Sequence, residues 1–374
     1  MTDVRKNMDA LVKIAQSPRT QLDRVLAEGK KAVGVVPYFA PEELVFAAGM
    51  VPFGIWGAEE QVSESKRYFP AFYCSILHTA LDLAIKGEFN GLSAVMIPLT
   101  CDSLKHMGAN WTCGVKGIPV IDVAYAQNRK LAAGEGFTES QFRKIKGQLE
   151  EIAGEKISDE AIAKANKVYN EDRRECLRFT ELAASHPQTV SLTDRALVLK
   201  ARYFMERDAH AAALKEINDA LAAMPAEAVK GKKIVTTGII ADSPELLSIL
   251  QDNGFVIAAD QIAHESVDFR ALADETGDPV KALAKRLTAV NGTSVLYDPA
   301  KARTTELVEL AKAAGADGVL WVLTKFCDPE EFDYVPGKRK LEAAGIPLLL
   351  IEIDQQMVNY EQVRTAIETF RDML

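Results

Sequence analysis

The stretch GVLWVLTKFCDPEE, which runs from Gly318 to Glu331, decides the fold of this chain. Its first eight residues, Gly318 to Lys325, are predominantly apolar and of strand length, which is typical of a strand buried on both faces of a parallel sheet. Cys327 and Asp328 follow at once, and the proline and acidic residues after them are typical of a helix start. The stretch therefore predicts a strand, a turn that carries a thiol, and a helix.

A second stretch repeats this arrangement. The segment AVMIP, residues 94–98, is predicted to be another buried strand, and LTCDS, residues 99–103, leads from it into a helix with Cys101 at the turn. Cys74 opens a third helix, the apolar-periodic run from Ser75 to Ile85. Unpaired N–H groups and the positive end of the helix dipole lower a thiol pKa and favour an anionic cluster. Cys74, Cys101 and Cys327 are therefore candidate ligands of one metal cluster with an open corner.

Each of these cysteines also has a simpler interpretation, because a lone intracellular thiol is usually a small buried apolar residue. Spacing alone does not prove a shared site. We assign Cys176, which lies within a predicted helix, to packing. Cys113 follows Cys101 closely in sequence, and we interpret it as a loop thiol, with a position near the cluster as the alternative.

Short apolar strands alternate with helical patterns at both ends of the chain, which predicts an α/β fold with parallel sheets covered on both faces. Residues 1–135 form an N-terminal helix plus the first such block, and residues 231–374 form the second. Residues 136–230 show long, charged helical periodicity and predict a helical segment. We expect two doubly wound parallel-sheet domains joined by this segment. Because ligands bind beyond the carboxyl ends of parallel strands, we expect the cluster in the cleft between the domains.

Composition limits the function. The chain has 374 residues, 48% of them apolar, which is enough for two domains with sizeable cores. A net charge of −9 argues against a nucleic-acid or anionic-membrane surface. The N-terminus has no signal-peptide core, and no apolar stretch approaches the roughly 20 residues that span a bilayer, so we expect a cytoplasmic protein. Five scattered cysteines argue against a disulfide framework.

The other motifs in the sequence do not indicate a specific function. The sequence contains neither a P-loop nor a strand-linked G-x-G-x-x-G, so no nucleotide motif is present. We interpret the GEG at residues 134–136 as a loop between helices, and Ser243 as the N-cap of a helix that begins with Pro244. His78 and His106 follow Cys74 and Cys101 by about one turn, and we interpret them as core residues or as partners of the ligands rather than as zinc ligands.

These motifs resemble a known family. The chain resembles the smaller, β-type subunit of the 2-hydroxyacyl-CoA dehydratases, which are oxygen-sensitive iron–sulfur enzymes of anaerobic fermentation. The resemblance covers essentially the whole length. It rests on PYFAPEEL (37–44), AAG (47–49), GIWG (54–57), YFPAFYCS (68–75), PLTCD (98–102), QNR (127–129), KFCDPEE (325–331) and IEIDQQ (351–356). Tyr125 and Ala126 stand where relatives tend to have His-Pro, a departure that concerns a local contact and not the cluster.

The resemblance implies a heterodimer in which both partners hold a 4Fe–4S cluster on three cysteines, here Cys74, Cys101 and Cys327. It implies an ATP-hydrolysing iron–sulfur activator that injects one electron at low potential. The acyl-CoA thioester is then reduced to a ketyl radical anion, which expels the 2-hydroxyl and loses a β-proton to give 2-enoyl-CoA, and the electron is recycled. The resemblance also implies that the acyl-CoA lies mainly on the larger subunit, so this chain is expected to serve mainly as an electron relay and structural partner. No catalytic side chain is assigned, and Asp102 and Asp328 are expected to cap helices or to tune the cluster.

Three alternatives remain open from the sequence. One is a subunit of an ATP-dependent reductase of the benzoyl-CoA type, built on the same scaffold. A second is a homodimeric double-cubane reductase, which should need more cluster-ligating cysteines. The third is an iron–sulfur electron-transfer or scaffold protein with no acyl-CoA site. The sequence does not identify the 2-hydroxyacyl group.

Overall fold

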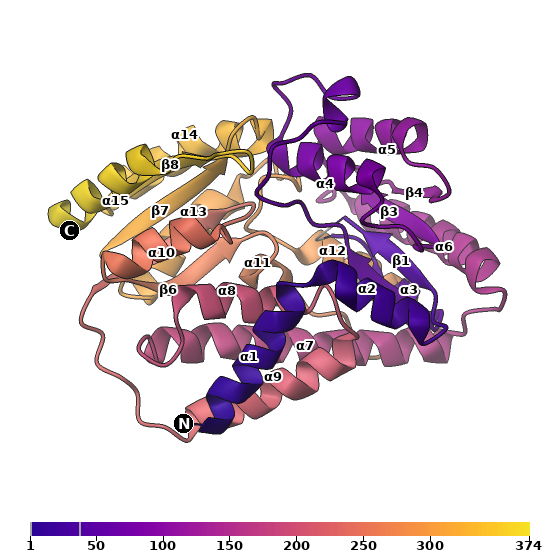
Figure 1. The fold of residues 1–374 in the computed structure, drawn as a ribbon, viewed down its shortest axis with the longest axis horizontal. Coiled ribbons are helices and arrows are strands. Elements are labelled where there is room, and N and C mark those ends of the chain that lie inside the picture. The colour runs from indigo at the N-terminus through magenta and orange to yellow at the C-terminus, as the bar shows by residue number, and fades with distance from the viewer. Residues whose placement is uncertain (1, 37–38) are drawn as a thin grey trace.

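The computed structural model describes residues 2–36 and 39–374, so Pro37 and Tyr38 of the PYFAPEEL string lie outside the described residues. Two four-stranded parallel sheets form the framework, which confirms the predicted α/β class (Figure 1). The strands are β1 Ala32–Val35, β2 Val51–Gly54, β3 Ala94–Pro98, β4 Val120–Val123, β5 Lys232–Gly238, β6 Phe255–Ile262, β7 Gly318–Thr324 and β8 Leu348–Ile353.

The two sheets have the same topology. Their strand orders are β2-β1-β3-β4 and β6-β5-β7-β8, so the order reverses between β1 and β3 in one sheet and between β5 and β7 in the other. Every residue of β1, β3 and β7 is buried, as expected of strands covered on both faces. A ligand crevice forms beyond the carboxyl ends of the strands at such a reversal. Cys101 follows β3 and Cys327 follows β7, so these two thiols occupy equivalent positions in the two sheets.

Helices cover and connect the sheets (Figure 1). They are α1 Thr2–Ala15, α2 Pro18–Ala27, α3 Glu42–Ala47, α4 Ser75–Lys86, α5 Asp102–Gly114, α6 Ala132–Ala153, α7 Asp159–Ser185, α8 Leu192–Ala201, α9 Arg207–Ala222, α10 Pro244–Asp252, α11 Ser266–Phe269, α12 Pro279–Ala289, α13 Ala302–Ala313, α14 Asp328–Ala343 and α15 Glu361–Met373. Within the described ranges, no helix combines the length and the apolar character needed to cross a membrane.

The interpretation of GEG at residues 134–136 as a loop was wrong. These residues belong to the first turns of α6, which begins at Ala132. Glycine disfavours a helix interior by about 1 kcal/mol relative to alanine, which is why the sequence pattern misled. At Gly134 the glycine is required by packing, because a Cβ there would lie 2.5 Å from the carbonyl oxygen of Arg129. The backbone of the turn before α6 thus approaches Gly134 closely, and helical periodicity in the sequence does not predict such a contact.

The helical segment packs beneath both sheets (Figure 1). The long helix α7 packs along α9, and α1 from the N-terminus crosses α8 and α9. Leu11, Cys176, Phe179, Leu214 and Ile217 belong to their shared apolar core. Cys176 is fully buried there, which confirms its assignment to packing. The helical segment is thus integrated into the molecule and is not a flexible linker.

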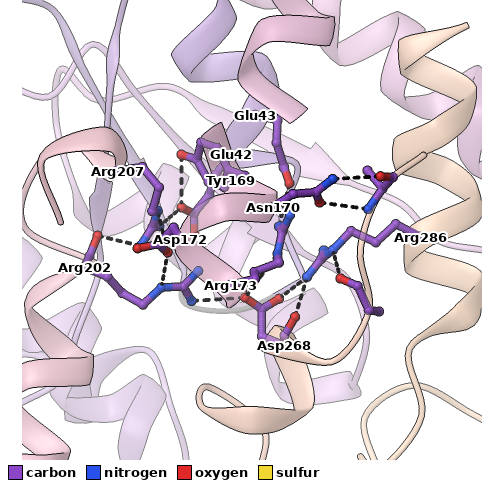
Figure 2. Close-up of polar contacts among 12 residues, drawn as sticks. Glu42, Glu43, Tyr169, Asn170, Asp172, Arg173, Arg202, Arg207, Asp268 and Arg286 are labelled. Carbon is purple, nitrogen blue, oxygen red and sulfur yellow. Dashed lines mark hydrogen bonds and ion pairs between the residues drawn. The ribbon is translucent and has the colours of Figure 1, made fainter. Parts of the chain in front are cut away.

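Figure 2 shows a buried group of ion pairs that connects α7 to α3 and to the region of α11 and α12. We call it the buried charge network, and it consists of Glu42, Glu43, Asp172, Arg173, Arg202, Arg207, Asp268 and Arg286. Its four carboxylates balance four guanidinium groups, which is the condition under which charges are tolerated in a protein interior. Glu42 and Glu43 come from α3, whereas Asp268 and Arg286 come from α11 and α12. The network therefore joins segments that are far apart in sequence.

The packing of β5 against β7 can be tested at the end of β5. Gly238 has a φ of 152°, and a Cβ at this position would lie 2.3 Å from the carbonyl oxygen of Val322 on β7. We expect Gly238→Ala to destabilise the protein by about 1–3 kcal/mol, because both the backbone conformation and the neighbouring strand must shift. Urea unfolding followed by circular dichroism measures the change.

Gly147 is the matched control. It lies inside α6, and a Cβ there would meet no atom within 4 Å. Gly147→Ala is expected to stabilise the protein by about 0.5–1 kcal/mol, since alanine is the better helix former. A Gly238→Ala protein as stable as wild type would contradict the packing described for β5 and β7.

Candidate metal centre

Each of the three candidate cysteines immediately precedes a helix. Cys74 precedes α4, Cys101 precedes α5 and Cys327 precedes α14, so their expected positions at helix starts are confirmed. Backbone N–H groups of the first turn point at each sulfur. They belong to Ile76 and Leu77 for Cys74, to Ser103 and Leu104 for Cys101, and to Glu330 for Cys327. Such N–H groups are donors to a thiolate or to an anionic cluster.

All three thiols line one cavity of about 480 Å³. Thr100 and Cys101 reach it from the loop after β3, and Ser294 and Cys327 reach it from the second sheet domain. Cys74 comes from α4, which no strand precedes directly. The structure therefore brings the three thiols together from three separate segments.

The loop after β8 explains how α4 is held against the second sheet domain. The backbone N–H of Gln355 donates to the hydroxyl of Ser75 at 3.1 Å, and Thr79 donates to the Gln355 side chain at 2.5 Å. Ser75 directly follows Cys74, so these bonds fix the first turn of α4. This is a structural reason for the IEIDQQ string, whose last residues lie in this loop.

The turn between β7 and Cys327 is strained. Phe326 has a φ of 64°, which lies in the left-handed region and costs a residue other than glycine about 1–3 kcal/mol. The Cys327 N–H closes the turn on the Thr324 carbonyl oxygen at 3.0 Å. The Phe326 side chain lines the cavity next to the thiol. The strained turn thus directs Cys327 into the cavity and also supplies part of its wall.

Without a cation, the thiols are held in their neutral form. Burial raises the pKa of Cys74 to about 12, and the nearby Cys101 contributes to this rise. Burial also raises the pKa of Cys101, against the opposing N–H groups of its helix. Burial, followed by the proximity of Cys74, raises the pKa of Cys327 well above its usual range. A cationic metal group at their centre would reverse this preference, and its binding would release the thiol protons.

The spacing of the three thiols differs from that of the sulfur ligands of a single zinc ion. Tetrahedral zinc places its sulfur ligands roughly 3.8 Å apart, as follows from a Zn–S bond of about 2.3 Å. In the described part of the chain, Cys74, Cys101 and Cys327 do not form a group whose ligand atoms all lie within 4.8 Å. At least two of the three ligand atoms therefore lie farther apart than two sulfur ligands of one tetrahedral zinc ion, whereas a polynuclear group can bridge such a separation.

Among the described residues, the ligand atoms of one group do all lie within 4.8 Å of one another. This group consists of Asp172, Cys176 and His210. Its polar atoms are already bonded. His210 contacts Asp172 through Nδ1 at 2.5 Å and the Val198 carbonyl oxygen through Nε2 at 3.1 Å, and Arg202 donates to Asp172 at 3.0 Å. This group therefore belongs to the protein's internal packing.

The remaining candidates lie around the cavity or away from it. His78 is buried and contacts the Pro70 carbonyl oxygen at 3.0 Å, whereas His106 contacts the Tyr73 hydroxyl at 3.0 Å. Ser243 accepts a bond from the Leu246 N–H, which confirms it as an N-cap. Cys113 is exposed and lies in the last turns of α5, so its interpretation as a loop thiol was wrong.

Asp102 and Asp328 line the cavity as the first residues of α5 and α14. The cap positions in front of them are occupied by the cysteines, so helix capping by these aspartates was a wrong expectation. Their carboxylates interact favourably with the positive end of the helix dipole from within the first turn. The side chain of Asp102 also pairs with Lys105 at 3.1 Å.

Sequence reasoning missed several residues around Cys327. Ser294 and Lys301 line the cavity from the segment before α13, and Arg303 lies buried behind them. Glu330 was recognised only as part of a motif string, yet its carboxylate is fully buried. No periodic or motif signal distinguishes an arginine that pairs inside the protein from one on the surface.

The fold and the cavity thus define an α/β protein with three cysteines gathered at the carboxyl ends of two parallel sheets. A model of the family described as "2-hydroxyglutaryl-CoA dehydratase, D-component" matches residues 37–374, and the chain belongs to this family. It is 45% identical to the (R)-phenyllactyl-CoA dehydratase β subunit of Clostridium sporogenes over 96% of both chains. It is 41% identical to the (R)-2-hydroxyglutaryl-CoA dehydratase subunit β of Acidaminococcus fermentans over 97% of both chains.

The lactoyl-CoA dehydratase subunit β of Anaerotignum propionicum is 37% identical over the full length of both chains. A subunit of the benzoyl-CoA reductase of Thauera aromatica is a more distant relative, at 22% identity over 92% of this chain and 91% of its own. The expected resemblance to β subunits of 2-hydroxyacyl-CoA dehydratases is therefore confirmed.

Proposed function

We propose that this chain is the β subunit of an (R)-2-hydroxyacyl-CoA dehydratase and that Cys74, Cys101 and Cys327 hold a 4Fe–4S cluster. The observation that carries this proposal is the convergence of the three helix-start cysteines on one cavity. The family match and the relatives named as dehydratase β subunits support the enzyme class.

When bound, such a cluster would supply one-electron transfer at low potential. The chain itself would hold it through three thiolates, leaving one position for a ligand other than cysteine. First-turn N–H groups of α4, α5 and α14 would donate to the sulfurs and stabilise their negative charge. Apolar walls that include Ile239 and Ile240 would limit access of water.

The partners follow from the division of labour in such an enzyme. We propose a heterodimer with a larger α subunit, which carries most of the acyl-CoA site, and a separate iron–sulfur activator that hydrolyses ATP. The absence of a nucleotide motif in this sequence supports a separate activator. The reaction removes the 2-hydroxyl and a β-proton as water to give 2-enoyl-CoA. One electron enters to form the ketyl radical and is recovered afterwards, so the reaction has no net oxidation or reduction.

ATP consumption tests this proposal. After one priming by activator and ATP under anoxia, the heterodimer is expected to form many 2-enoyl-CoA molecules per ATP hydrolysed, because the electron is recycled. Product per ATP is measured after ATP is removed, with lactoyl-, phenyllactyl-, 2-hydroxyisocaproyl- and 2-hydroxyglutaryl-CoA offered separately. The acyl-CoA that is turned over fastest identifies the substrate. The isolated chain with a chemical reductant is the control and is expected to be inactive.

The same measurement separates the alternatives. Product formation that stops at once when ATP is removed would favour a ring reductase, which the similarity to the benzoyl-CoA reductase of Thauera aromatica makes a specific rival. Turnover by the isolated chain would contradict the placement of substrate on the partner. Iron binding without turnover of any acyl-CoA by the primed heterodimer would favour an electron-transfer protein.

A further inference from the structure

A buried ion pair lies directly behind Cys327. Arg303 of α13 donates to both carboxylate oxygens of Glu330 of α14, with a distance of 3.0 Å from Nη2 to Oε2. Their side chains are 3% and 0% exposed, respectively. Trp321 of β7 donates its indole N–H to the same carboxylate at 2.9 Å, and the Arg303 guanidinium lies over the Trp321 ring. The pair is therefore fixed in position and screened from solvent.

This ion pair adjoins the cavity of the three thiols. Ser294 lines the cavity and donates its hydroxyl to Glu330 at 2.5 Å. The backbone N–H of Glu330 points at the Cys327 sulfur. The Ser294 hydroxyl thus lies between the cavity and the Glu330 carboxylate. Glu330 is in the first turn of α14, the helix that directly follows Cys327.

A second ion pair lies beside the first. Lys301 lines the cavity and pairs with Asp333 of α14, which also lies 3.6 Å from Arg303. The two cations and two carboxylates cancel, so these two ion pairs together are electrically neutral. Lys325, Asp328 and Glu331 are the other charged residues near Cys327 in sequence, and all three are exposed. Buried charges act on a neighbouring group with less solvent screening than exposed ones.

We propose that Glu330 is a positioning residue that keeps the reduction potential of the group on Cys74, Cys101 and Cys327 low, by cancelling the charge of Arg303. The inference rests on the proposed function. An added electron is stabilised by a nearby uncompensated cation, and charge near a cluster is one of the factors that set its potential. With Glu330 in place, the positive charge of Arg303 is compensated and does not make the cluster easier to reduce.

The test is a redox titration of the full-length chain with its iron–sulfur cluster assembled under anoxia, followed by electron paramagnetic resonance. Glu330→Gln leaves Arg303 uncompensated. It is expected to raise the equilibrium constant for taking up an electron at least tenfold, which is a positive shift of about 59 mV for one electron. The double variant Arg303→Gln/Glu330→Gln removes both charges and is expected to return to the wild-type potential.

Lys301→Gln provides a second, independent measurement. It removes a cation from the cavity wall and leaves Asp333 beside Arg303, so the potential is expected to shift in the opposite, negative direction. This side chain is 41% exposed, so the variant also serves if Glu330→Gln does not retain its cluster. Asp219→Asn is the matched control, because it makes the same charge change as Glu330→Gln at an exposed pair on α9.

Each outcome bears on the inference. Opposite shifts for Glu330→Gln and Lys301→Gln, with recovery in the double variant and none for Asp219→Asn, support it. Unchanged potentials, shifts of the same sign, or a double variant that stays shifted overturn it while leaving the cluster assignment intact. A wild-type chain that assembles no iron–sulfur cluster overturns the proposed ligands, and this inference with them.

Discussion

Replacing Cys74, Cys101 or Cys327 singly with alanine is expected to remove most of the iron and sulfide from the anaerobically purified protein. The three thiols line one cavity, and no other cysteine among the described residues lines it. Two thiolates are a poor anchor for a cubane cluster, so each loss should abolish the cluster and the activity of the heterodimer together. Iron and sulfide analysis and the visible absorption spectrum measure the effect.

Two cysteines of the same chain serve as controls. Cys113→Ala changes an exposed residue at the end of α5, and Cys176→Ala changes a buried one in the helical core. Both proteins are expected to keep about four irons per chain under the proposed cluster type. A Cys74, Cys101 or Cys327 variant that keeps its full iron content would exclude that residue as a ligand.

The second large effect is expected at Asp268, a central carboxylate of the buried charge network (Figure 2). It pairs with Arg286 at 2.5 Å and Arg202 at 3.0 Å, and Arg173 lies 4.0 Å away. Asp268→Asn is expected to destabilise the protein by about 3–5 kcal/mol, because it leaves buried guanidinium groups without their counter-charge. Chemical unfolding measures the loss.

The pH dependence follows from the same contacts. Burial alone would raise the pKa of Asp268, but Arg286, Arg173 and Arg202 outweigh it and hold the pKa well below its usual range. An aspartate with a lowered folded pKa stabilises the protein above its unfolded pKa of about 3.9, and this stability is lost as the pH falls towards the folded value. Wild type should therefore lose stability below about pH 4, and Asp268→Asn should show a weaker dependence there.

Asp274→Asn is the control for this prediction. Asp274 lies six residues further along the chain and pairs with Lys285, but both side chains are more than half exposed. Exposed pairs contribute about 0–1 kcal/mol, so its loss should be small. Equal losses in the two variants would mean that the buried position of Asp268 does not determine its contribution.

The strands and the helix starts could be predicted from the sequence because the signals are local. The GVLWVLTK run predicted a strand that the structure places at Gly318–Thr324, and AVMIP is a strand over its whole length. A buried parallel strand is apolar along its length, and a helix start has a short characteristic pattern. For the same reason, the helix-start positions of Cys101 and Cys327 were visible without coordinates.

Helix boundaries inside long polar segments were less accurate. The predicted helical segment at residues 136–230 gave no boundary near its C-terminal end, where the structure separates α8 from α9 around residues 202–206. There the guanidinium of Arg207 donates to the Arg202 carbonyl oxygen at 2.7 Å, and both arginines enter the buried charge network. The break depends on partners from other helices, which helical periodicity does not describe.

The amino-acid sequence by itself determined the α/β class, the two strand–cysteine–helix units and the family, because each of these depends on patterns of residues that are contiguous in the sequence. Only the tertiary structure decided that Cys74 joins the other two thiols, because α4 is held by Gln355 from the far end of the chain. It alone placed Arg303 and Glu330 behind Cys327. These contacts join residues distant in sequence, and their energy comes from burial and charge pairing that exist only once the chain has folded.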